Sequence, residues 1–224
     1  MLVHGLVISS RYMEPLALAL RGDFDVHAPD LPGFGESTMR GSTLSVRELA
    51  DALRLWLGAR GIERAMFVGN SFGCQILADF AARYPESVDR LVLQGPTVDR
   101  NAHSLIAQMH RDGRNGRLEQ ARSSAPIGRI DYAKAGILRA LATMRELMRD
   151  RIERKLSRIA APTLVVAGSR DPVAPLAWAG EVAARVPNGA LLTIDGGTHT
   201  LNYVYPHSFA LAIRPFLLQS GAST

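Results

Sequence analysis

One stretch of the chain reads Ala65-Met66-Phe67-Val68-Gly69-Asn70-Ser71-Phe72-Gly73. The apolar run 65–68 is typical of a buried strand and a helical pattern begins at Phe72, so Ser71 is predicted to lie on a sharp strand-to-helix turn. Glycines two residues before and after the serine fit this interpretation, because the backbone doubles back tightly there. Such a turn lifts the hydroxyl clear of the sheet and points a helix N-terminus at it. The stretch therefore predicts a nucleophilic serine, with an ordinary glycine-rich strand–helix junction as the alternative.

Short apolar runs alternate with helical patterns along the rest of the chain, which is typical of a mostly parallel sheet with crossover helices. The predicted strands are Leu2–Leu6, Phe24–Ala28, Ala65–Val68, Arg90–Leu93, Leu164–Ala167 and Ala190–Ile194. The predicted helices are 46–61, which begins with a capping box of Ser45 and Glu48, then Phe72–Tyr84, Leu176–Val186 and His207–Leu218. We expect an α/β fold with a sheet of about six strands and helices on both faces.

The segment 98–161 departs from this alternation and is rich in arginine. It carries loop signals at Asp112-Gly113, Asn115-Gly116 and Pro126-Ile127-Gly128, followed by a helical stretch near Tyr132–Leu156. An insertion this long between two core strands is typical of a lid, because about 12 residues suffice for a plain crossover. We expect a core of residues 1–97 and 162–224 and a small helical cap of residues 98–161, hereafter the cap segment. A longer crossover of the same fold is the alternative.

Composition excludes several classes of protein. The chain has 224 residues, of which 47% are hydrophobic and 21% charged, the balance of one globular domain rather than of a disordered chain. The single cysteine, Cys74, cannot form an internal disulfide or a multi-cysteine metal centre, and we expect it to be a small buried helix residue. No apolar run reaches the roughly 18 residues of a membrane span, and the N-terminus lacks a signal-peptide pattern. We expect a soluble cytoplasmic protein without stable membrane insertion.

The net charge of +5 is concentrated in one region. Residues 100–158 contain 14 basic and 6 acidic residues, whereas the rest of the chain contains 12 basic and 15 acidic residues. No aromatic residues interleave with the arginines, as a platform for single-stranded nucleic acid would need. We expect a solvated basic face that favours anionic substrates, and no binding of nucleic acid.

Two polar residues follow predicted strands at the edge where strand carboxyl ends meet, which is where sites collect in open α/β sheets. His199 ends Gly196-Gly197-Thr198-His199, and Asp171 lies in Gly168-Ser169-Arg170-Asp171-Pro172. A histidine can take the proton of a serine hydroxyl, and an aspartate can orient that histidine. The order Ser71, Asp171, His199 is that of hydrolases with a serine on such a turn. Asp99, which follows the preceding strand, is the alternative carboxylate.

The loop His4-Gly5-Leu6-Val7 follows the first predicted strand and can offer a backbone N–H to a developing oxyanion. We expect the two donors to be the backbone N–H groups of Leu6 and Phe72, the residue after the serine. A simple strand end is the alternative interpretation of this loop.

Together these stretches resemble the α/β-hydrolase superfamily, in particular its small bacterial esterase-like members. The matching stretches are His4-Gly5 with Ser9–Tyr12, Asp30–Ser37, the turn at Ser71, Gly168–Pro172 and Gly196–His199. The resemblance implies a serine hydrolase that cleaves small-molecule carboxylic esters through an acyl-enzyme, without metal or organic cofactor. Haloalkane dehalogenases and epoxide hydrolases of the superfamily carry an aspartate where this chain has Ser71. Carbon–carbon bond hydrolysis or perhydrolysis at the same site, or non-catalytic binding of small molecules, remain the alternatives.

Members of this superfamily normally begin with an antiparallel strand pair that precedes the His-Gly strand, whereas Met1 falls within that strand here. Without the pair, Phe24–Ala28 is expected to form a sheet edge with unpaired backbone groups, which invites pairing with another chain. Asp23, Asp25 and Pro29 blunt this edge in part. A weak homodimer is therefore the expected outcome.

Overall fold

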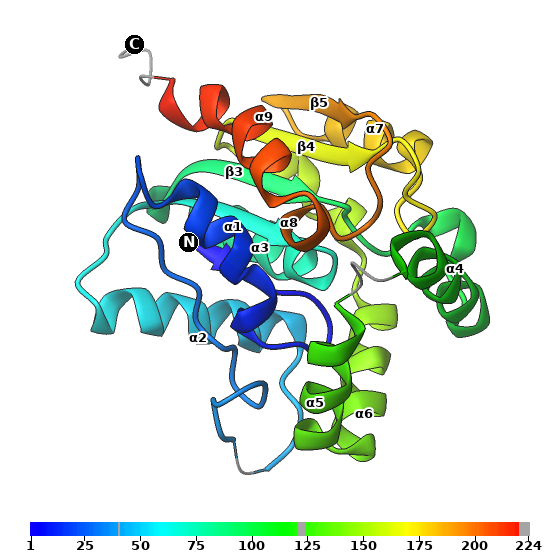
Figure 1. The fold of residues 1–224 in the computed structure, drawn as a ribbon. Helices are drawn as coiled ribbons and strands as arrows, with labels where there is room; N and C mark the ends of the chain where they lie inside the picture. Colours follow the sequence, from blue (N-terminus) through cyan, green and yellow to red (C-terminus); the bar gives the residue numbers. More distant parts are fainter. Residues whose placement is uncertain (40, 121–123, 220–224) are drawn as a thin grey trace.

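The computed structural model describes residues 1–39, 41–120 and 124–219, and in this part of the chain the strands form one parallel sheet (Figure 1). The strands are β1 (Leu2–Val3), β2 (Ala65–Asn70), β3 (Val88–Gln94), β4 (Thr163–Gly168) and β5 (Gly189–Ile194), and their order in space is their order in the sequence. The expected parallel α/β sheet is thus confirmed, with five strands rather than about six.

The register of the sheet brings the carboxyl ends of the strands together. Asn70 at the end of β2 pairs with Gln94 at the end of β3, and Gly168 at the end of β4 pairs with Ile194 at the end of β5. Parallel strands all end at the same edge, so the loops that follow β2, β4 and β5 converge there. This edge is where the sequence places Ser71, Asp171 and His199.

Helices cover both faces of the sheet. In β2, Phe67 packs in one apolar cluster while its neighbour Val68 packs in another, as alternation along a strand buried on both faces requires. The Phe67 face is covered by α2 (Val46–Ala59), α3 (Phe72–Arg83) and α7 (Leu176–Arg185). The Val68 face is covered by α1 (Glu14–Leu20), α8 (Leu201–Val204) and α9 (Pro206–Leu218), and Figure 1 shows α1 and α9 side by side.

The helix signals of the core are confirmed to within a few residues at each end. The capping box at the start of α2 is present: the Ser45 hydroxyl accepts the backbone N–H of Glu48, and the Glu48 carboxylate accepts the backbone N–H of Ser45. A capping box satisfies two backbone donors reciprocally within four consecutive residues, so the sequence alone predicts where the helix begins.

The predicted strand Phe24–Ala28 is wrong. The segment is irregular, and it is joined to the first strand by the Leu2 N–H, which donates to the His27 carbonyl at 2.8 Å. Phe24, Val26 and Ala28 nevertheless pack against the apolar cluster beneath α1 and α9. The alternating pattern therefore reflects packing rather than pairing. The first strand is also shorter than predicted, because residues 4–6 leave the sheet.

The loop signals predicted in the cap segment are wrong as well. Asp112-Gly113 and Asn115-Gly116 lie inside α4 (Leu105–Glu119), and Pro126 lies in the first turn of α5 (Ala125–Ala135). Proline fits a first helical turn because its missing N–H has no partner there in any case. The Asn115 side chain is engaged by a distant backbone group instead of competing with its own helix. After Gly136, α6 (Ile137–Arg149) follows, and then 3-10 turns at Ile152–Arg154 and Leu156–Arg158.

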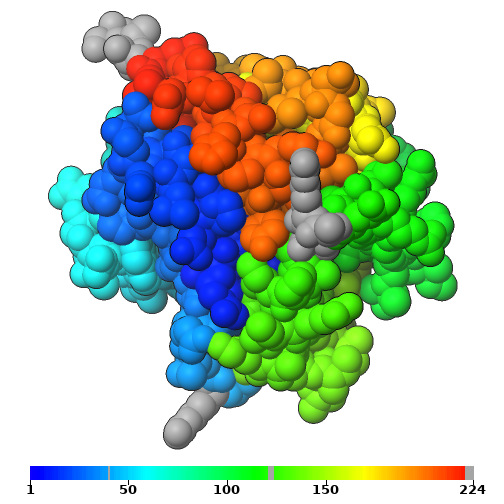
Figure 2. Space-filling model, in the orientation of Figure 1, coloured from blue at the N-terminus to red at the C-terminus, as the bar shows by residue number. Residues whose placement is uncertain are grey.

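The cap segment packs on the core through one face of α6 and through the 3-10 turns that follow it. Ala140 and Leu147 of α6, and Ile152 and Leu156 after it, belong to the same apolar cluster as Phe67 of β2. Figure 2 shows the cap segment in green against the N-terminal segment in blue and the C-terminal region in orange. The division between core and cap at residues 98 and 161 stays a prediction.

Candidate active site

Ser71 lies on the turn between β2 and α3, with φ 55° and ψ −117°. A positive φ is uncommon for a residue with a side chain and marks a tight, strained turn. The Ser71 N–H donates to the Gln94 carbonyl at 3.0 Å, which ties the turn to β3. A Cβ atom at Gly73 would lie 2.5 Å from the Val3 carbonyl oxygen and 2.8 Å from that of His4. Glycine is therefore required at 73, because α3 begins in direct contact with the end of β1.

His199 and Asp171 form a buried pair. The His199 Nδ1–H donates to Asp171 Oδ2 at 2.8 Å, and the two side chains are 5% and 0% exposed. Asp171 Oδ1 in turn accepts the backbone N–H groups of Val173 and Ala174 at 2.8 and 3.0 Å. The carboxylate is thus held from both oxygens, and it fixes the tautomer and the plane of the imidazole.

The other ring nitrogen of His199, Nε2, is buried and makes no hydrogen bond with any residue that the structure describes. Burial lowers the pKa of His199, but the charge and hydrogen bond of Asp171 raise it, and the charges of Asp112 and Glu119 add to the rise. The net direction is upward, so this environment stabilises an imidazolium. Nε2 is therefore a buried nitrogen ready to accept a proton from a neighbouring group.

Asp99, the alternative carboxylate, is engaged elsewhere. Its Oδ2 accepts from Arg111 Nη1 at 2.9 Å, and its Oδ1 accepts the Asn101 N–H at 2.9 Å. Of the two candidates, Asp171 is the one that contacts His199.

Two buried amide side chains hold the main chain of His199. The His199 carbonyl accepts from Gln94 Nε2 at 2.7 Å and from Asn70 Nδ2 at 3.2 Å. Asn70 Oδ1 accepts from the Tyr12 hydroxyl at 2.8 Å. Neither Asn70 nor Gln94 was predicted from the sequence. Each is a polar residue that directly follows an apolar run at the end of a strand, 65–69 for Asn70 and 91–93 for Gln94, and this is the signal that could have found them.

The cap segment holds the same loop from the other side. Asn115 Oδ1 accepts the His199 N–H at 3.0 Å. Glu119 Oε1 accepts the Thr200 N–H at 3.1 Å and the Thr200 hydroxyl at 2.5 Å. Sequence analysis missed these residues too, because it interpreted Asn115-Gly116 as a loop.

The predicted oxyanion loop is anchored through His4. Its Nε2 accepts the Leu31 N–H at 3.0 Å, and its Nδ1–H donates to the Gly5 carbonyl at 2.9 Å, so the ring is neutral. Burial, the largest influence, lowers the pKa of His4. Leu6 lies at the same cavity as Ser71, and Phe72 is the first residue of α3, where backbone N–H groups have no partner within the helix. Their role as oxyanion donors stays a prediction.

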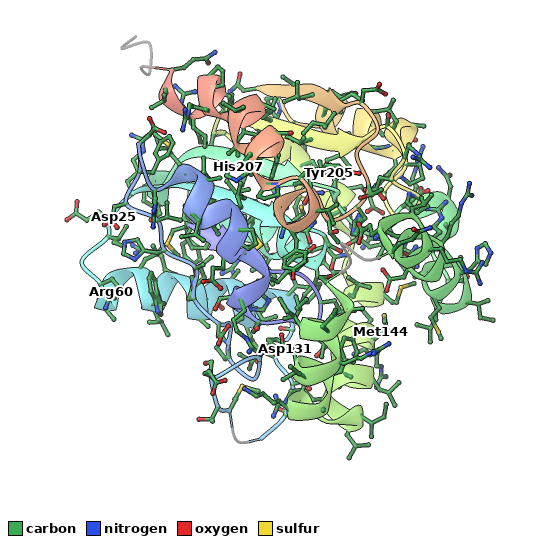
Figure 3. All side chains as sticks on the ribbon, viewed as in Figure 1. Asp25, Arg60, Asp131, Met144, Tyr205 and His207 are labelled. Carbon is green, nitrogen blue, oxygen red and sulfur yellow. The ribbon has the colours of Figure 1, made fainter. Side chains whose placement is uncertain are left out.

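A cavity of about 210 Å³ joins these parts. Ser71 and His199 both line it, together with residues of the N-terminal loop and of the cap segment. The N-terminal loop contributes Gly5 and Leu6 to the lining, and the cap segment contributes Gln108, Asp112, Tyr132 and Met144. Figure 3 labels Met144 on α6 and Asp131 on α5, where Asp131 accepts the Ser9 N–H at 2.7 Å and joins α5 to the N-terminal loop. The cavity therefore lies between the sheet edge and the cap segment.

Other kinds of site find less support within residues 1–39, 41–120 and 124–219. No group of three or more His, Cys, Asp or Glu side chains is arranged there to hold a metal ion. Every helix described also falls short of the length and apolarity needed to cross a bilayer. Cys74 is buried and donates to the Gly69 and Gln94 carbonyls, as a structural helix residue does.

Comparison with known proteins defines the class. The family model of the α/β hydrolase fold matches residues 1–117, more than half of the chain, and a model described as TAP-like protein matches residues 143–222. The chain therefore belongs to the α/β-hydrolase family, and its relatives are of esterase and hydrolase type.

Individual relatives resemble the chain over nearly its whole length. A pimeloyl-acyl-carrier-protein methyl ester esterase of Xanthomonas campestris is 26% identical over 96% of this chain and 93% of that protein. The structure of a thermophilic esterase from Thermogutta terrifontis matches with a TM-score of 0.79 at 22% identity, over 96% of this chain and 88% of that one. A meta-cleavage product hydrolase from Pseudomonas fluorescens matches with a TM-score of 0.78, also at 22% identity, over 96% and 88% of the two chains. The two structural matches show the fold.

Replacing Gly73 tests the close contact at the serine turn. A Gly73→Ala variant is expected to lose about 1–3 kcal/mol of unfolding free energy, because the new methyl group must push α3 away from β1. Gly113→Ala on α4 is the matched control, since a Cβ there meets nothing within 4 Å and alanine favours a helix. Urea denaturation measures both. Equal stabilities for the two variants would contradict the contact.

Proposed function

We propose that the chain is a serine hydrolase that cleaves carboxylic esters through an acyl-enzyme. The observation that carries the proposal is the buried His199–Asp171 pair, which shares a cavity with Ser71 on the strained turn and whose Nε2 has no hydrogen-bond partner among the described residues. A base that is fixed by a carboxylate and shares a cavity with a serine at a helix N-terminus supplies the groups that make a hydroxyl nucleophilic.

The reaction follows from these groups. The Ser71 hydroxyl attacks the ester carbonyl carbon while His199 Nε2 takes its proton, and Asp171 stabilises the imidazolium. The backbone N–H groups of Leu6 and Phe72 donate to the oxyanion of the tetrahedral intermediate. Collapse expels the alcohol, which receives the proton from Nε2. Water then attacks the acyl-enzyme while His199 Nε2 takes its proton. Collapse of the second tetrahedral intermediate breaks the ester bond to Ser71, whose oxygen receives that proton as the carboxylic acid leaves.

Ser71→Ala tests the nucleophile. The variant is expected to lose turnover of p-nitrophenyl butyrate by a factor on the order of 10⁴ while it stays folded, because the acyl-enzyme cannot form. Initial rates and circular dichroism on purified protein measure the two properties. Retention of about a tenth of the wild-type rate would remove Ser71 from the mechanism.

Turnover of other substrates by the wild type separates an ester hydrolase from the alternative functions. Turnover of a vinylogous diketone without turnover of esters would indicate carbon–carbon bond hydrolysis. Peracid formation from a carboxylic acid and hydrogen peroxide would indicate perhydrolysis. A folded wild-type protein that turns over none of these substrates would be a binding protein of this fold.

A pair of aspartate variants tests which carboxylate orients the base. Asp171→Asn is expected to lower kcat by a factor on the order of 10⁴, because an amide in that place favours the wrong tautomer of His199. Asp99→Asn is the matched control and keeps most of the activity, since Asp99 bonds Arg111 and not the imidazole. A larger loss in Asp99→Asn than in Asp171→Asn would reverse the assignment.

The charge of the cavity also supports a substrate class. The basic cap segment was expected to favour anionic substrates, but among the described residues that line the cavity Asp112 is the acidic one and none is arginine or lysine. Arg111, which reaches the carbonyl of the lining residue Val173, is paired with Asp99. We therefore assign neutral or cationic esters to this site.

Asp112→Asn tests the substrate class with two esters of matched length, p-nitrophenyl hexanoate and the mono-p-nitrophenyl ester of glutaric acid. The wild type is expected to favour the neutral ester by roughly tenfold in kcat/KM, since like charges about 4 Å apart repel by 1–4 kcal/mol. The Asp112→Asn variant is expected to lose most of this preference. The control is Glu86→Gln, at an exposed residue of the 3-10 turn Pro85–Ser87 that is not among the residues lining the cavity, and it is expected to keep the preference.

The preference should also depend on pH. Asp112 is exposed by its accessible area, but the protein packed around its carboxyl group limits the solvation of the charged form and raises its pKa. The charge of His199 opposes that rise, and the charges of Glu119 and Asp171 add to it. Asp112 therefore loses its charge at a higher pH than an ordinary aspartate as the solution is acidified, and the preference weakens in that range. A wild type that favours the glutarate ester would contradict the assignment.

A further inference from the structure

Helix α4 turns polar residues toward the interior. Gln108, Asn115 and Glu119 are only 6%, 4% and 6% exposed, whereas the apolar residues Ile106 and Met109 are 82% and 62% exposed. A helix of a globular protein ordinarily buries its apolar stripe and leaves its polar face in water. Burying polar groups costs free energy unless they are hydrogen-bonded, so the inward face of α4 must be explained by its partners.

The partners of this face lie in the loop that carries His199. Asn115 accepts the backbone N–H of His199, and Glu119 accepts the backbone N–H and the hydroxyl of Thr200. The carbonyl of His199 is bonded by Gln94 and Asn70 from the sheet. The main chain of His199 is therefore held by side chains at both its N–H and its carbonyl, and α4 supplies one half of that support.

The same helix lines the cavity. Gln108 stands two turns and Asp112 one turn before Asn115 on this helix, and both border the cavity with Ser71. One helix therefore contacts both the cavity and the loop that carries His199.

We propose that α4 positions the general base: Asn115 and Glu119 fix the main chain of His199, so that the placement of the cap segment sets the placement of the imidazole. The proposal rests on the proposed function, since it assumes that His199 acts on Ser71. Asn115 and Glu119 act through His199 and are positioning residues.

Glu119 also acts on His199 through its charge. The charged groups that face His199 are Asp171, from the loop after β4, and Asp112 and Glu119, from α4. Hydrogen bonding and charge can be separated at Glu119, because glutamine keeps an acceptor oxygen and loses the negative charge. A merely structural role of Glu119 would not move the pH profile of the reaction.

The experiment measures kcat and KM for p-nitrophenyl butyrate, and the rate of fluorophosphonate labelling of Ser71, as functions of pH. Asn115→Ala and Glu119→Ala are each expected to lower kcat by about tenfold or more with KM changed by about twofold or less, because a small displacement of a base lowers the rate steeply. Glu119→Gln is expected to restore most of the rate at high pH. The acid limb of the pH–rate profile of Glu119→Gln is expected to move to lower pH, because the loss of a negative charge lowers the pKa of His199.

Ser104→Ala is the matched control. The Ser104 hydroxyl caps α4 by accepting the Ala107 N–H at 3.1 Å, so its loss weakens the helix by about 1 kcal/mol without touching the His199 loop. Kinetic losses in Ser104→Ala as large as those in the Asn115 and Glu119 variants would overturn the proposal. So would wild-type kinetics in both alanine variants, or a Glu119→Gln pH profile that does not shift.

Different outcomes contradict the proposed function and the role of α4. A wild-type protein that fluorophosphonate does not label at Ser71 contradicts the proposed function itself. Labelling of the wild type and of every α4 variant at equal rates contradicts only the role of α4. If an alanine variant does not fold, the pH profile of Glu119→Gln decides the question.

Discussion

The site depends on how tightly one histidine is held. The ring of His199 is bonded through Nδ1 to Asp171, its carbonyl to Gln94 and Asn70, and its N–H to Asn115. These partners come from the loop after β4, from the ends of β2 and β3, and from the cap segment. A loop residue has no ladder of its own to fix its backbone, so each of these bonds replaces part of the support that a strand or helix would give. Within the part of the chain that the structure describes, the ring nitrogen Nε2 has no hydrogen-bond partner.

The serine turn is the second constraint, and it explains the short first strand. Ser71 adopts a strained backbone conformation of a kind that costs about 1–3 kcal/mol and persists only where the surroundings enforce it. The Gln94 carbonyl holds the Ser71 N–H, and α3 begins against the carbonyls of Val3 and His4. The chain leaves the sheet directly after Val3 and turns into the loop that carries Leu6. The nucleophile and the predicted oxyanion loop are thus placed by the same contact.

Sequence could predict the features that are decided locally. The capping box of α2 needs four residues, and the serine turn needs a strand, two glycines and a helix start, all within one stretch. The parallel topology followed from the alternation of runs and helices, and it placed Asp171 and His199 at one edge. The features that depend on distant partners were mispredicted or missed. Phe24–Ala28 alternates like a strand but packs without pairing, and Asn115-Gly116 signals a turn until its side chain meets a backbone group 84 positions away.

The most direct test of the account is to identify the residue that an activity-based fluorophosphonate modifies. Intact-mass measurement followed by peptide mapping locates the adduct on the purified chain. The account predicts one adduct per chain, on Ser71, formed at a rate that falls as His199 is protonated and that collapses in His199→Gln. An adduct on another residue, or none on a folded protein, would contradict the claim that His199 activates Ser71.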